Sequence, residues 1–314
     1  MPPTIQPDDI RAAAERIRPL SRRTPVLTSA VFDAEANVRT YFKCENLQTG
    51  GAFKIRGAAN LILSLPDVSH GVIAYSSGNH AQATAIAARH VGAQATIVMP
   101  EDAPRSKTEA TRSHGARIVT YNRFTQSREQ IADQILKETG AMLVPPFDHP
   151  MIMAGQGTAA LELLEETGPL DALITPIGGG GLLAGCATIA KDLQSAIRVF
   201  GAEPEGANDT FLSLMAGERI SVQPDTIADG LRAPKPGELT FPVLQRLVEK
   251  VALVSDDELR ATVKFLLIHM KILIEPSGAA AAAAILFHKL PADLRAVGVV
   301  LSGGNIDFEE LARY

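Results

Sequence analysis

A lysine lies between apolar residues in the stretch 50–58 (GGAFKIRGA), which carries glycines on both sides. Glycine allows a tight turn or a close approach of the backbone to a ligand. An ammonium group held among Phe53, Ile55 and Ala58 is expected to be partly desolvated. Desolvation lowers the pKa of Lys54 and makes its neutral, nucleophilic amine accessible. A surface lysine beside a turn is the alternative, and the glycine-rich stretches further along the chain decide between them.

Four successive glycines follow an apolar run that reads as a strand, and they open a predicted helix. They are Gly178, Gly179, Gly180 and Gly181, followed by Leu182. Backbone N–H groups without side chains at a helix N-terminus form a cradle for an anion such as phosphate. The spacing matches neither the nucleotide-binding loop that ends in Gly-Lys-Ser/Thr nor the dinucleotide-binding Gly-x-Gly-x-x-Gly pattern. A flexible turn is the alternative, but four glycines carry a large entropic cost.

Two further turns lie at the ends of predicted strands. The stretch 76–80 (SSGNH) precedes a helix, where its hydroxyls and N–H groups can cap the helix and can also hold a carboxylate. Capping alone explains this stretch equally well. The stretch 302–305 (SGGN) follows the last strand, at the carboxyl edge where open α/β sheets bind their ligands.

Short apolar strands alternate with helices along most of the chain, which is typical of βαβ units and parallel sheets. Strands are predicted at 38–45, 72–75, 95–99, 116–121, 142–144, 172–175, 197–202 and 297–301. Helices are predicted at 7–18, 55–65, 79–90, 104–114, 127–139, 151–167, 182–193, 241–249, 256–271 and 276–289. We therefore expect an α/β fold with two sheets and a cleft between them. Residues 217–240, rich in glycine and proline, are the expected mobile connection.

The composition excludes several classes of protein. The 314 residues carry a net charge of −5 and no basic block, which argues against nucleic-acid and anionic-membrane partners. Two cysteines, Cys44 and Cys186, are too few for a disulfide scaffold or a cysteine-rich metal site. No secretory signal is visible at the N-terminus, and the longest apolar run, 278–287, is too short to span a bilayer. A cytoplasmic protein is expected.

A lysine, a phosphate cradle and hydroxyl-bearing turns suggest a phosphorylated aldehyde cofactor held as a Schiff base. In order and spacing the chain resembles the fold type II pyridoxal-phosphate enzymes, specifically the serine/threonine dehydratase and serine racemase family. The matching motifs are 24–29 (TPVLTS), 53–58 (FKIRGA), 76–80 (SSGNH), 154–158 (AGQGT), 178–182 (GGGGL), 274–278 (IEPSG) and 301–305 (LSGGN). The resemblance implies a tryptophan synthase β-like fold, with two open twisted parallel-sheet domains and the cofactor cleft between them. It also implies a large cofactor-binding domain of residues 1–70 and 146–314, and a small mobile substrate domain of residues 71–145.

The resemblance assigns roles to single residues. Lys54 would carry the cofactor as a Schiff base and, once freed by substrate, act as the base on one face of Cα. The other cofactor contacts would be Phe53 near the ring, Asn79 at its 3′-hydroxyl, Gly178, Gly179, Gly180, Gly181 and Leu182 at the phosphate, and Ser302 at the pyridine nitrogen. The substrate carboxylate would be bound by Ser76, Ser77, Asn79 and His80.

The resemblance also implies an activity. A serine at position 302 cannot keep the ring nitrogen protonated as a carboxylate would, so the ring is a weaker electron sink. We therefore expect β-elimination of water from L-serine or L-threonine, giving an oxo acid and ammonia. We also expect the enzyme to be a homodimer. In the family a serine matching Ser77 faces Cα opposite the lysine. Two opposed acid/base groups are what stereoinversion needs, so a serine or aspartate racemase is an alternative. The simpler role for Ser77 is to bind the substrate carboxylate without acting as an acid or base.

A divalent-cation site is a further implication. The loop 202–209 (AEPEGAND) resembles the cation loop of the racemase branch, in which Glu203, Asp209 and the carbonyl of Ala207 would bind Mg²⁺, Ca²⁺ or Mn²⁺ through oxygen. Asn208 departs from the acidic neighbour that can occur there. A solvated acidic loop is the alternative.

The choice of substrate stays open in the sequence. A 3-hydroxyaspartate dehydratase needs a cation for the second carboxylate, and Arg128 resembles a small-domain arginine that reaches the cleft. Arg128 could equally lie on the surface beside Glu129, and His149 and Lys107 are weaker candidates. Whether ATP or another nucleotide activates the protein is undecided. A β-replacement synthase and a non-catalytic amino-acid-binding protein are further alternatives, and the presence of Lys54 argues against the latter.

Overall fold

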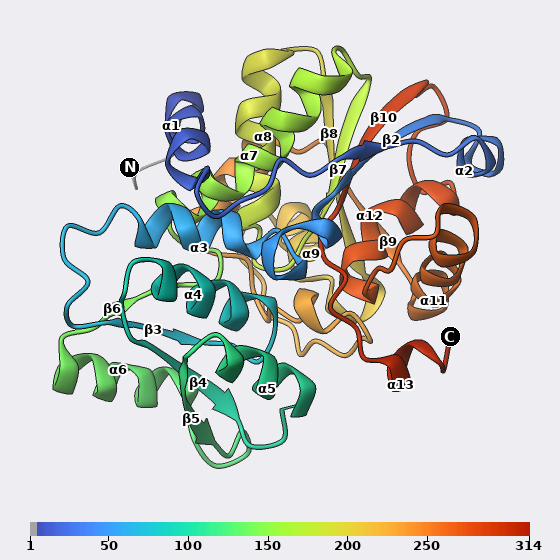
Figure 1. The fold of residues 1–314 in the computed structure, drawn as a ribbon. Coiled ribbons are helices and arrows are strands. Elements are labelled where there is room, and N and C mark those ends of the chain that lie inside the picture. The colour runs from blue at the N-terminus through green and yellow to red at the C-terminus, as the bar shows by residue number, and fades with distance from the viewer. Residues whose placement is uncertain (1–4, 104) are drawn as a thin grey trace.

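The apolar runs of the sequence form two β-sheets in the computed structural model, which describes residues 5–103 and 105–314 (Figure 1). The larger sheet has the order β1-β2-β10-β7-β8-β9, and only β1 runs antiparallel to its neighbour. Its strands are β1 (Val26–Leu27), β2 (Arg39–Cys44), β7 (Ala172–Pro176), β8 (Arg198–Pro204), β9 (Lys250–Val254) and β10 (Ala296–Leu301). The smaller sheet is parallel throughout, in the order β5-β4-β3-β6. It consists of β3 (Val72–Tyr75), β4 (Ala95–Pro100), β5 (Arg117–Tyr121) and β6 (Met142–Leu143).

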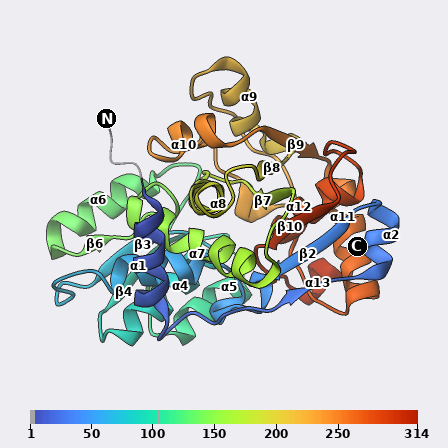
Figure 2. The same cartoon turned by 90° about the horizontal axis from the view of Figure 1, so that it is seen from above.

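Helices cover both faces of the larger sheet, which is why its central strands are buried apolar runs without alternation. One face is covered by α1 (Pro7–Ile17), α7 (Pro150–Thr167), α8 (Gly181–Leu193) and α10 (Thr240–Leu247). The other is covered by α2 (Ala30–Ala36), α11 (Asp256–Phe265) and α12 (Pro276–Leu286). Seen from above, α7 and α8 stand on one side of the strands and α2 and α11 on the other (Figure 2). A short helix, α9 (Asp209–Ala216), packs against β9 and α10.

The helix α3 (Lys54–Ile62) joins the two parts of the molecule, because it packs against both α7 and α4 (Figure 1). Its apolar residues Ile55 and Ala58 share a core with the smaller sheet. The helices of that sheet are α4 (Asn79–His90), α5 (Arg105–Ser113) and α6 (Arg128–Thr139). The chain ends with α13 (Phe308–Leu311). No helix of the described residues is both long enough and apolar enough to cross a membrane.

The prediction of an α/β fold with two open parallel sheets is confirmed. The strand at 72–75 and the helix at 79–90 have the predicted bounds. Pro104, the predicted start of a helix, lies outside the described residues, and α5 begins at Arg105. The predicted helix 256–271 continues past α11 as a π-helix over Leu266–Met270. Residues 217–240 contain a short 3₁₀ turn, Asp229–Leu231, and end at the first residue of α10, and whether they move stays a prediction.

Candidate functional site

The Lys54 stretch lies against the turn that follows β10. Phe53 N–H donates a 3.0 Å hydrogen bond to the main-chain oxygen of Ser302, and Ala52 pairs with Gly303 in an isolated antiparallel bridge. These contacts hold the beginning of α3 against the carboxyl end of β10. The structure therefore places the predicted lysine at the edge of the larger sheet where ligands of open α/β folds bind.

Lys54 is half-buried, and its amine lies against protein groups. Its Nζ donates a 2.7 Å hydrogen bond to the main-chain oxygen of Pro146 and lies 5.2 Å from the centroid of the Phe53 ring. Desolvation by burial lowers the pKa of Lys54 to about 8. A substantial fraction of this amine is therefore neutral near physiological pH, which a reaction with an aldehyde requires.

The turn at 76–80 opens α4 beside this amine. Ser76 Oγ accepts a 3.2 Å hydrogen bond from Gly78 N–H, and α4 begins at Asn79. His80 Nε2 donates to the main-chain oxygen of Val144 at 2.8 Å, which leaves its Nδ1 as a buried acceptor with no partner in the part of the chain that the structure describes. Burial and the nearby charge of Lys54 lower the pKa of His80 to about 3. His80 is therefore a neutral group that positions the turn.

An amide network joins this turn to the larger sheet. Asn79 Nδ2 donates to Glu275 Oε1 at 2.6 Å, and Asn79 Oδ1 accepts from Asn305 Nδ2 at 2.8 Å. Asn305 Nδ2 also donates to Gly50 O at 2.7 Å, and its Oδ1 would be 2.3 Å from a Cβ at Gly51. Burial raises the pKa of Glu275 to about 8. Glu275 and Asn305 belong to motifs identified in the sequence, but their hydrogen bonds to Asn79 are seen only in the structure.

The four glycines form the turn into α8, with Gly180 at φ 92°. Close neighbours leave no room for side chains, since a Cβ at Gly179 would lie 2.3 Å from the Phe147 ring and one at Gly181 2.6 Å from Gln156 Oε1. Within the described part of the chain, the N–H groups of Gly178, Gly179 and Gly180 have no hydrogen-bond acceptor. The first N–H groups of α8, which begins at Gly181, have no acceptor within the helix either. The loop therefore offers a row of unpaired donors at a positive helix end.

The remaining predicted residues lie around this centre. Ser302 is almost fully buried, and its hydroxyl makes no hydrogen bond to any described residue. Ser77 is half-buried between β3 and α4. Arg128, at the start of α6, pairs with Glu129 at 2.8 Å, and its guanidinium lies 5.2 Å from the ring centroid of Tyr75. Because Tyr75 ends β3 directly before the 76–80 turn, Arg128 lies next to the carboxyl end of that strand.

Two buried carboxylates occupy the loop after β8. Glu203 accepts hydrogen bonds from Thr210 N–H at 3.0 Å and Phe211 N–H at 2.8 Å. Both carboxylate oxygens of Asp209 are buried and have no hydrogen-bond partner among the described residues, and Ala207 is also buried. Burial raises the pKa of Glu203 to about 8, with a further contribution from Asp209, and burial raises the pKa of Asp209 to about 7. No group of three or more His, Cys, Asp or Glu side chains suited to a metal occurs in residues 5–103 and 105–314.

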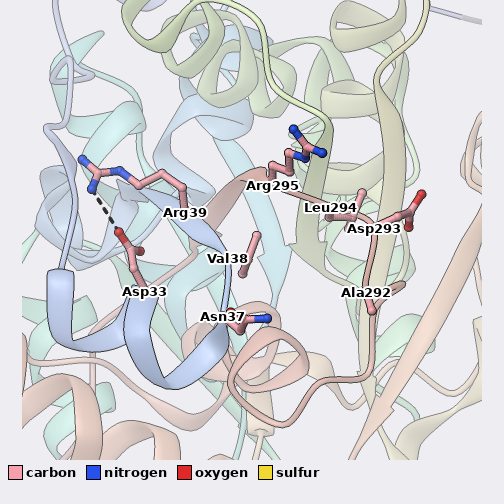
Figure 3. A pocket seen from close by; sticks show the side chains of 8 residues that line it. All are labelled: Asp33, Asn37, Val38, Arg39, Ala292, Asp293, Leu294 and Arg295. Atoms are coloured by element: carbon pink, nitrogen blue, oxygen red, sulfur yellow. Dashed lines mark hydrogen bonds and ion pairs between the residues drawn. The ribbon is translucent and has the colours of Figure 1, made fainter.

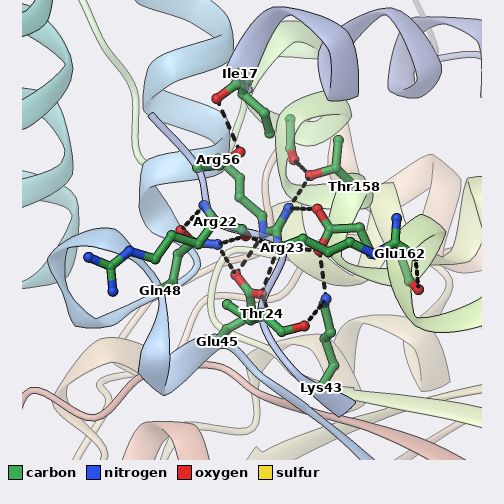
Figure 4. Close-up of polar contacts among 12 residues, drawn as sticks. Ile17, Arg22, Arg23, Thr24, Lys43, Glu45, Gln48, Arg56, Thr158 and Glu162 are labelled. Carbon is green, nitrogen blue, oxygen red and sulfur yellow. Dashed lines mark hydrogen bonds and ion pairs between the residues drawn. The ribbon is translucent and has the colours of Figure 1, made fainter. Parts of the chain in front are cut away.

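A buried ionic network around Arg56, two residues after Lys54 on α3, holds this helix in place (Figure 4). Arg56 is fully buried and forms two-pronged ion pairs, with Glu45 at 2.7 and 2.8 Å and with Glu162 at 2.8 Å for both bonds. Lys43 Nζ pairs with Glu162 at 2.6 Å, and Thr24 Oγ1 donates to Glu45 at 2.5 Å. The network contains two cations and two anions, so its charges balance. The motif that contains Arg56 is recognisable in the sequence, but its ion-pair partners Glu45 and Glu162 are not.

One surface hollow is separate from this site. A hollow of about 670 Å³ is lined by residues such as Asp33, Arg39 and Arg295 (Figure 3). Arg39 begins β2 and Arg295 directly precedes β10, so the hollow lies at the amino ends of these strands. Lys54 and the glycine loop lie at the carboxyl ends, where the ligands of such sheets bind.

The site fits a phosphorylated aldehyde. The unpaired N–H groups of the glycine loop suit a phosphate, and the desolvated Lys54 amine suits a carbonyl carbon. Phe147 connects the two, because its ring packs on Gly179 while the preceding Pro146 oxygen accepts from Lys54.

Comparison with known proteins agrees with this chemistry. The family model described as "Pyridoxal-phosphate dependent enzyme" matches residues 17–303. The chain is 47% identical over 307 residues to the L-threo-3-hydroxyaspartate ammonia-lyase of Saccharomyces cerevisiae, covering 97% of this chain and 94% of that one. It is 43% identical to the serine racemase of Schizosaccharomyces pombe, covering 98% and 96%. The structure of maize serine racemase superposes with a TM-score of 0.96 at 42% identity, covering 99% of this chain and 97% of that one.

Proposed function

The chain belongs to the pyridoxal-phosphate dependent enzyme family, and from this premise we propose that it is an ammonia-lyase that eliminates water from a 3-hydroxy amino acid. We take L-serine and L-threonine as the first candidates. The observation that carries the proposal is the Lys54 amine, which is desolvated and lies beside both the 76–80 turn and the Phe147 that packs on the glycine loop.

Each group of the chain has a defined task in this proposal. Pyridoxal phosphate, when bound, supplies an aldehyde for the amino group and a conjugated ring that withdraws electrons from Cα. The N–H groups of residues 178–182 would hold the phosphate, and Phe53, Asn79 and Ser302 would contact the ring. The turn at 76–80 binds the substrate carboxylate at the amino end of α4.

Lys54 Nζ then moves the proton in this proposal. It would take the proton from Cα and return a proton to the β-hydroxyl, which would leave as water. The released enamine reacts with water to give an oxo acid and ammonia, so that atoms and charges balance. The neutral hydroxyl of Ser302 supports elimination, because a carboxylate there would favour a longer-lived carbanion at Cα.

A second candidate substrate is 3-hydroxyaspartate. Arg128 supports it, because this cation lies at the carboxyl end of β3, next to the turn proposed to bind the α-carboxylate. A bidentate guanidinium is suited to a second carboxylate. The yeast relative carries this substrate in its name. The ion pair of Arg128 with Glu129 would have to open for such a contact.

Racemisation is the alternative activity, and Ser77 is the residue that supports it. The fission-yeast relative and the maize structure are named serine racemases. We infer that Ser77 is an acid/base group on the face of Cα opposite Lys54, and that loss of its hydroxyl removes D/L interconversion more than elimination.

We also infer a divalent cation and a homodimer. Asp209 and Glu203, with the Ala207 carbonyl, supply the oxygen ligands that Mg²⁺ or Ca²⁺ prefers, and the unpaired oxygens of Asp209 support this.

For the dimer, the exposed side chains of Ile268 and Leu273 offer an apolar face. The exposed Leu47 lies near it, because the neighbouring Asn46 donates a hydrogen bond to the main-chain oxygen of Leu273. Sedimentation should then give twice the 33.4 kDa chain mass.

The experiment that tests the function is a panel of oxo-acid release. L-serine, D-serine, L-threonine and the 3-hydroxyaspartate isomers are each incubated with the holoenzyme, with Lys54→Ala as the inactive control. We expect release from at least one L-3-hydroxy amino acid. Arg128→Met should reduce turnover of 3-hydroxyaspartate selectively if that is the substrate. A protein that binds the cofactor but releases no oxo acid from any of them contradicts the proposal, and D/L interconversion of serine then distinguishes a racemase from a binding protein.

A further inference from the structure

One carbonyl of the glycine loop is held from outside the loop. Gly179 O accepts a 2.7 Å hydrogen bond from Thr240 Oγ1 and a 3.2 Å hydrogen bond from Gly237 N–H. Thr240 is fully buried and is the first residue of α10. A Cβ at Gly180 would lie 2.9 Å from the same hydroxyl, so the contact between α10 and the loop is close.

This contact fixes the direction of a donor. A peptide unit is planar and trans, so its C=O and N–H point in opposite directions. The carbonyl of Gly179 and the N–H of Gly180 belong to one peptide unit. Because two donors of residues 237–240 hold the carbonyl, the N–H of Gly180 must point away from α10. That N–H has no acceptor among the described residues.

The start of α10 is itself held by a carboxylate from far along the chain. Asp148 accepts hydrogen bonds from the N–H groups of Glu238 at 2.8 Å, Leu239 at 2.8 Å and Thr240 at 3.3 Å. A Cβ at Gly237 would lie 2.2 Å from Asp148 Oδ1, so this carboxylate also requires the glycine there. Asp148 thus does from a distance what an N-cap residue does locally.

Asp148 ends a three-residue segment that contacts Lys54, the glycine loop and the start of α10. Pro146 O accepts the hydrogen bond from Lys54, Phe147 packs on the glycine loop, and Asp148 caps α10. The segment leads from β6 of the smaller sheet to α7. The orientation of the loop donors therefore depends on residues outside the loop.

We propose that Thr240 and Asp148 are positioning residues for the cofactor phosphate. Asp148 sets the start of α10, Thr240 Oγ1 fixes the Gly179 carbonyl, and the N–H of Gly180 is thereby held ready for a phosphate oxygen. This inference rests on the proposed role of the glycine loop. Neither residue touches the phosphate in this scheme, so substitution acts by allowing the peptide to turn.

The test measures cofactor affinity. Cofactor-free protein is titrated with pyridoxal phosphate, and the ³¹P NMR shift of the bound phosphate is recorded. Thr240→Val keeps the shape and removes the donor, and we expect a dissociation constant raised about tenfold with a changed phosphate shift. Thr240→Ser keeps the hydroxyl and should restore most of the affinity. Asp148→Asn should weaken binding in the same direction, because an amide nitrogen cannot accept.

A matched control separates positioning from general stability. Asp171 Oδ2 accepts from Arg295 N–H at 2.7 Å and Ala296 N–H at 2.9 Å, at the amino end of β10 and away from the site. Asp171→Asn should lower the thermal midpoint and leave the cofactor affinity unchanged. The inference is overturned if the dissociation constant of Thr240→Val lies within twofold of wild type. It is also overturned if Asp171→Asn loses as much cofactor affinity as Thr240→Val. Wild-type protein that binds no pyridoxal phosphate would refute the proposed function instead, and the inference with it.

Discussion

The amine of Lys54 gives the first prediction at the scale of single residues. Its pKa is lowered from 10.5 to about 8 because burial disfavours the charged form. Only the neutral amine adds to an aldehyde, so the rate at which cofactor-free protein takes up pyridoxal phosphate should rise with pH, with a midpoint near 8. Stopped-flow absorbance between pH 6 and 10 measures this rate. A rate still rising tenfold per pH unit above pH 9 indicates an ordinary lysine and contradicts this account.

Arg56 gives the second prediction. Removing it leaves Glu45 fully buried without its main cation and Glu162 with only Lys43. Loss of one partner of a buried ion pair costs about 3–5 kcal/mol. Arg56→Ala should therefore lower the urea midpoint of the apoprotein strongly. It should also weaken cofactor binding, because Lys54 lies two residues away on α3.

The matched control for this variant is Arg23→Ala. Arg23 pairs with Glu165 at 2.9 Å, but both side chains are about half exposed. A surface pair of this kind is worth about 1 kcal/mol or less. If the two variants shift the midpoint equally, the Arg56 network does not stabilise the start of α3 as we describe.

Some of these residues can be found in the sequence and others cannot. Lys54 and the four glycines stand out because their types are unusual at those places. Glu162 and Asp148 do not, since a glutamate on an amphipathic helix and an aspartate after a turn are ordinary surface choices. Glu162 lies 106 positions from Arg56 and Asp148 lies 92 positions from Thr240. Only the packing of α7 and α10 brings these pairs together.

At the scale of elements, the sequence predicts what periodicity and turn chemistry determine. The strand–turn–helix at 72–90 is predicted with its bounds, because a buried apolar strand, a Ser-Ser-Gly turn and an alanine-rich helix each have a clear signature. β9 is missed, because its five residues begin with Lys250 and join the sheet only through β8. The short helices α2 and α9, of seven and eight residues, are also missed.

The loop between β8 and α9 gives the prediction at this scale. The buried, unpaired carboxylate of Asp209 is stabilised if a cation binds there. Dialysis against a chelator should lower the thermal midpoint, and Mg²⁺ or Ca²⁺ should restore it. Bound cation at 100 times its dissociation constant adds about 2.7 kcal/mol. In Asp209→Asn, the midpoint should no longer respond to either cation, and indifference of the wild-type protein to chelator removes the metal proposal.

At the scale of the whole molecule, side chains connect the two sheets. Lys107 on α5 pairs with Asp229 of the 3₁₀ turn in the larger part, and Asn79 on α4 bonds Glu275. We propose that residues 71–145 move as a unit and that these contacts hold them closed over Lys54. The sequence could not show this arrangement, because both contacts join segments more than 100 positions apart.

This proposal predicts the behaviour of Lys107→Met. Loss of the pair with Asp229 should favour the open arrangement, and hydrogen exchange of the α4 and α5 amides should become a few-fold faster. A partly exposed ion pair is worth at most about 1 kcal/mol, which corresponds to a factor of about five. Arg105→Met is the control, because Arg105 pairs with Glu109 within the same helix. Equal exchange in both variants argues against a closing contact.

The central claim is that Lys54 is the residue to which the cofactor is attached. Borohydride reduction of the holoenzyme followed by peptide mass spectrometry tests it most directly. We expect the pyridoxyl mass on the peptide that contains Lys54 and no adduct in Lys54→Ala. An adduct on another lysine, or one that persists in Lys54→Ala, would contradict the account.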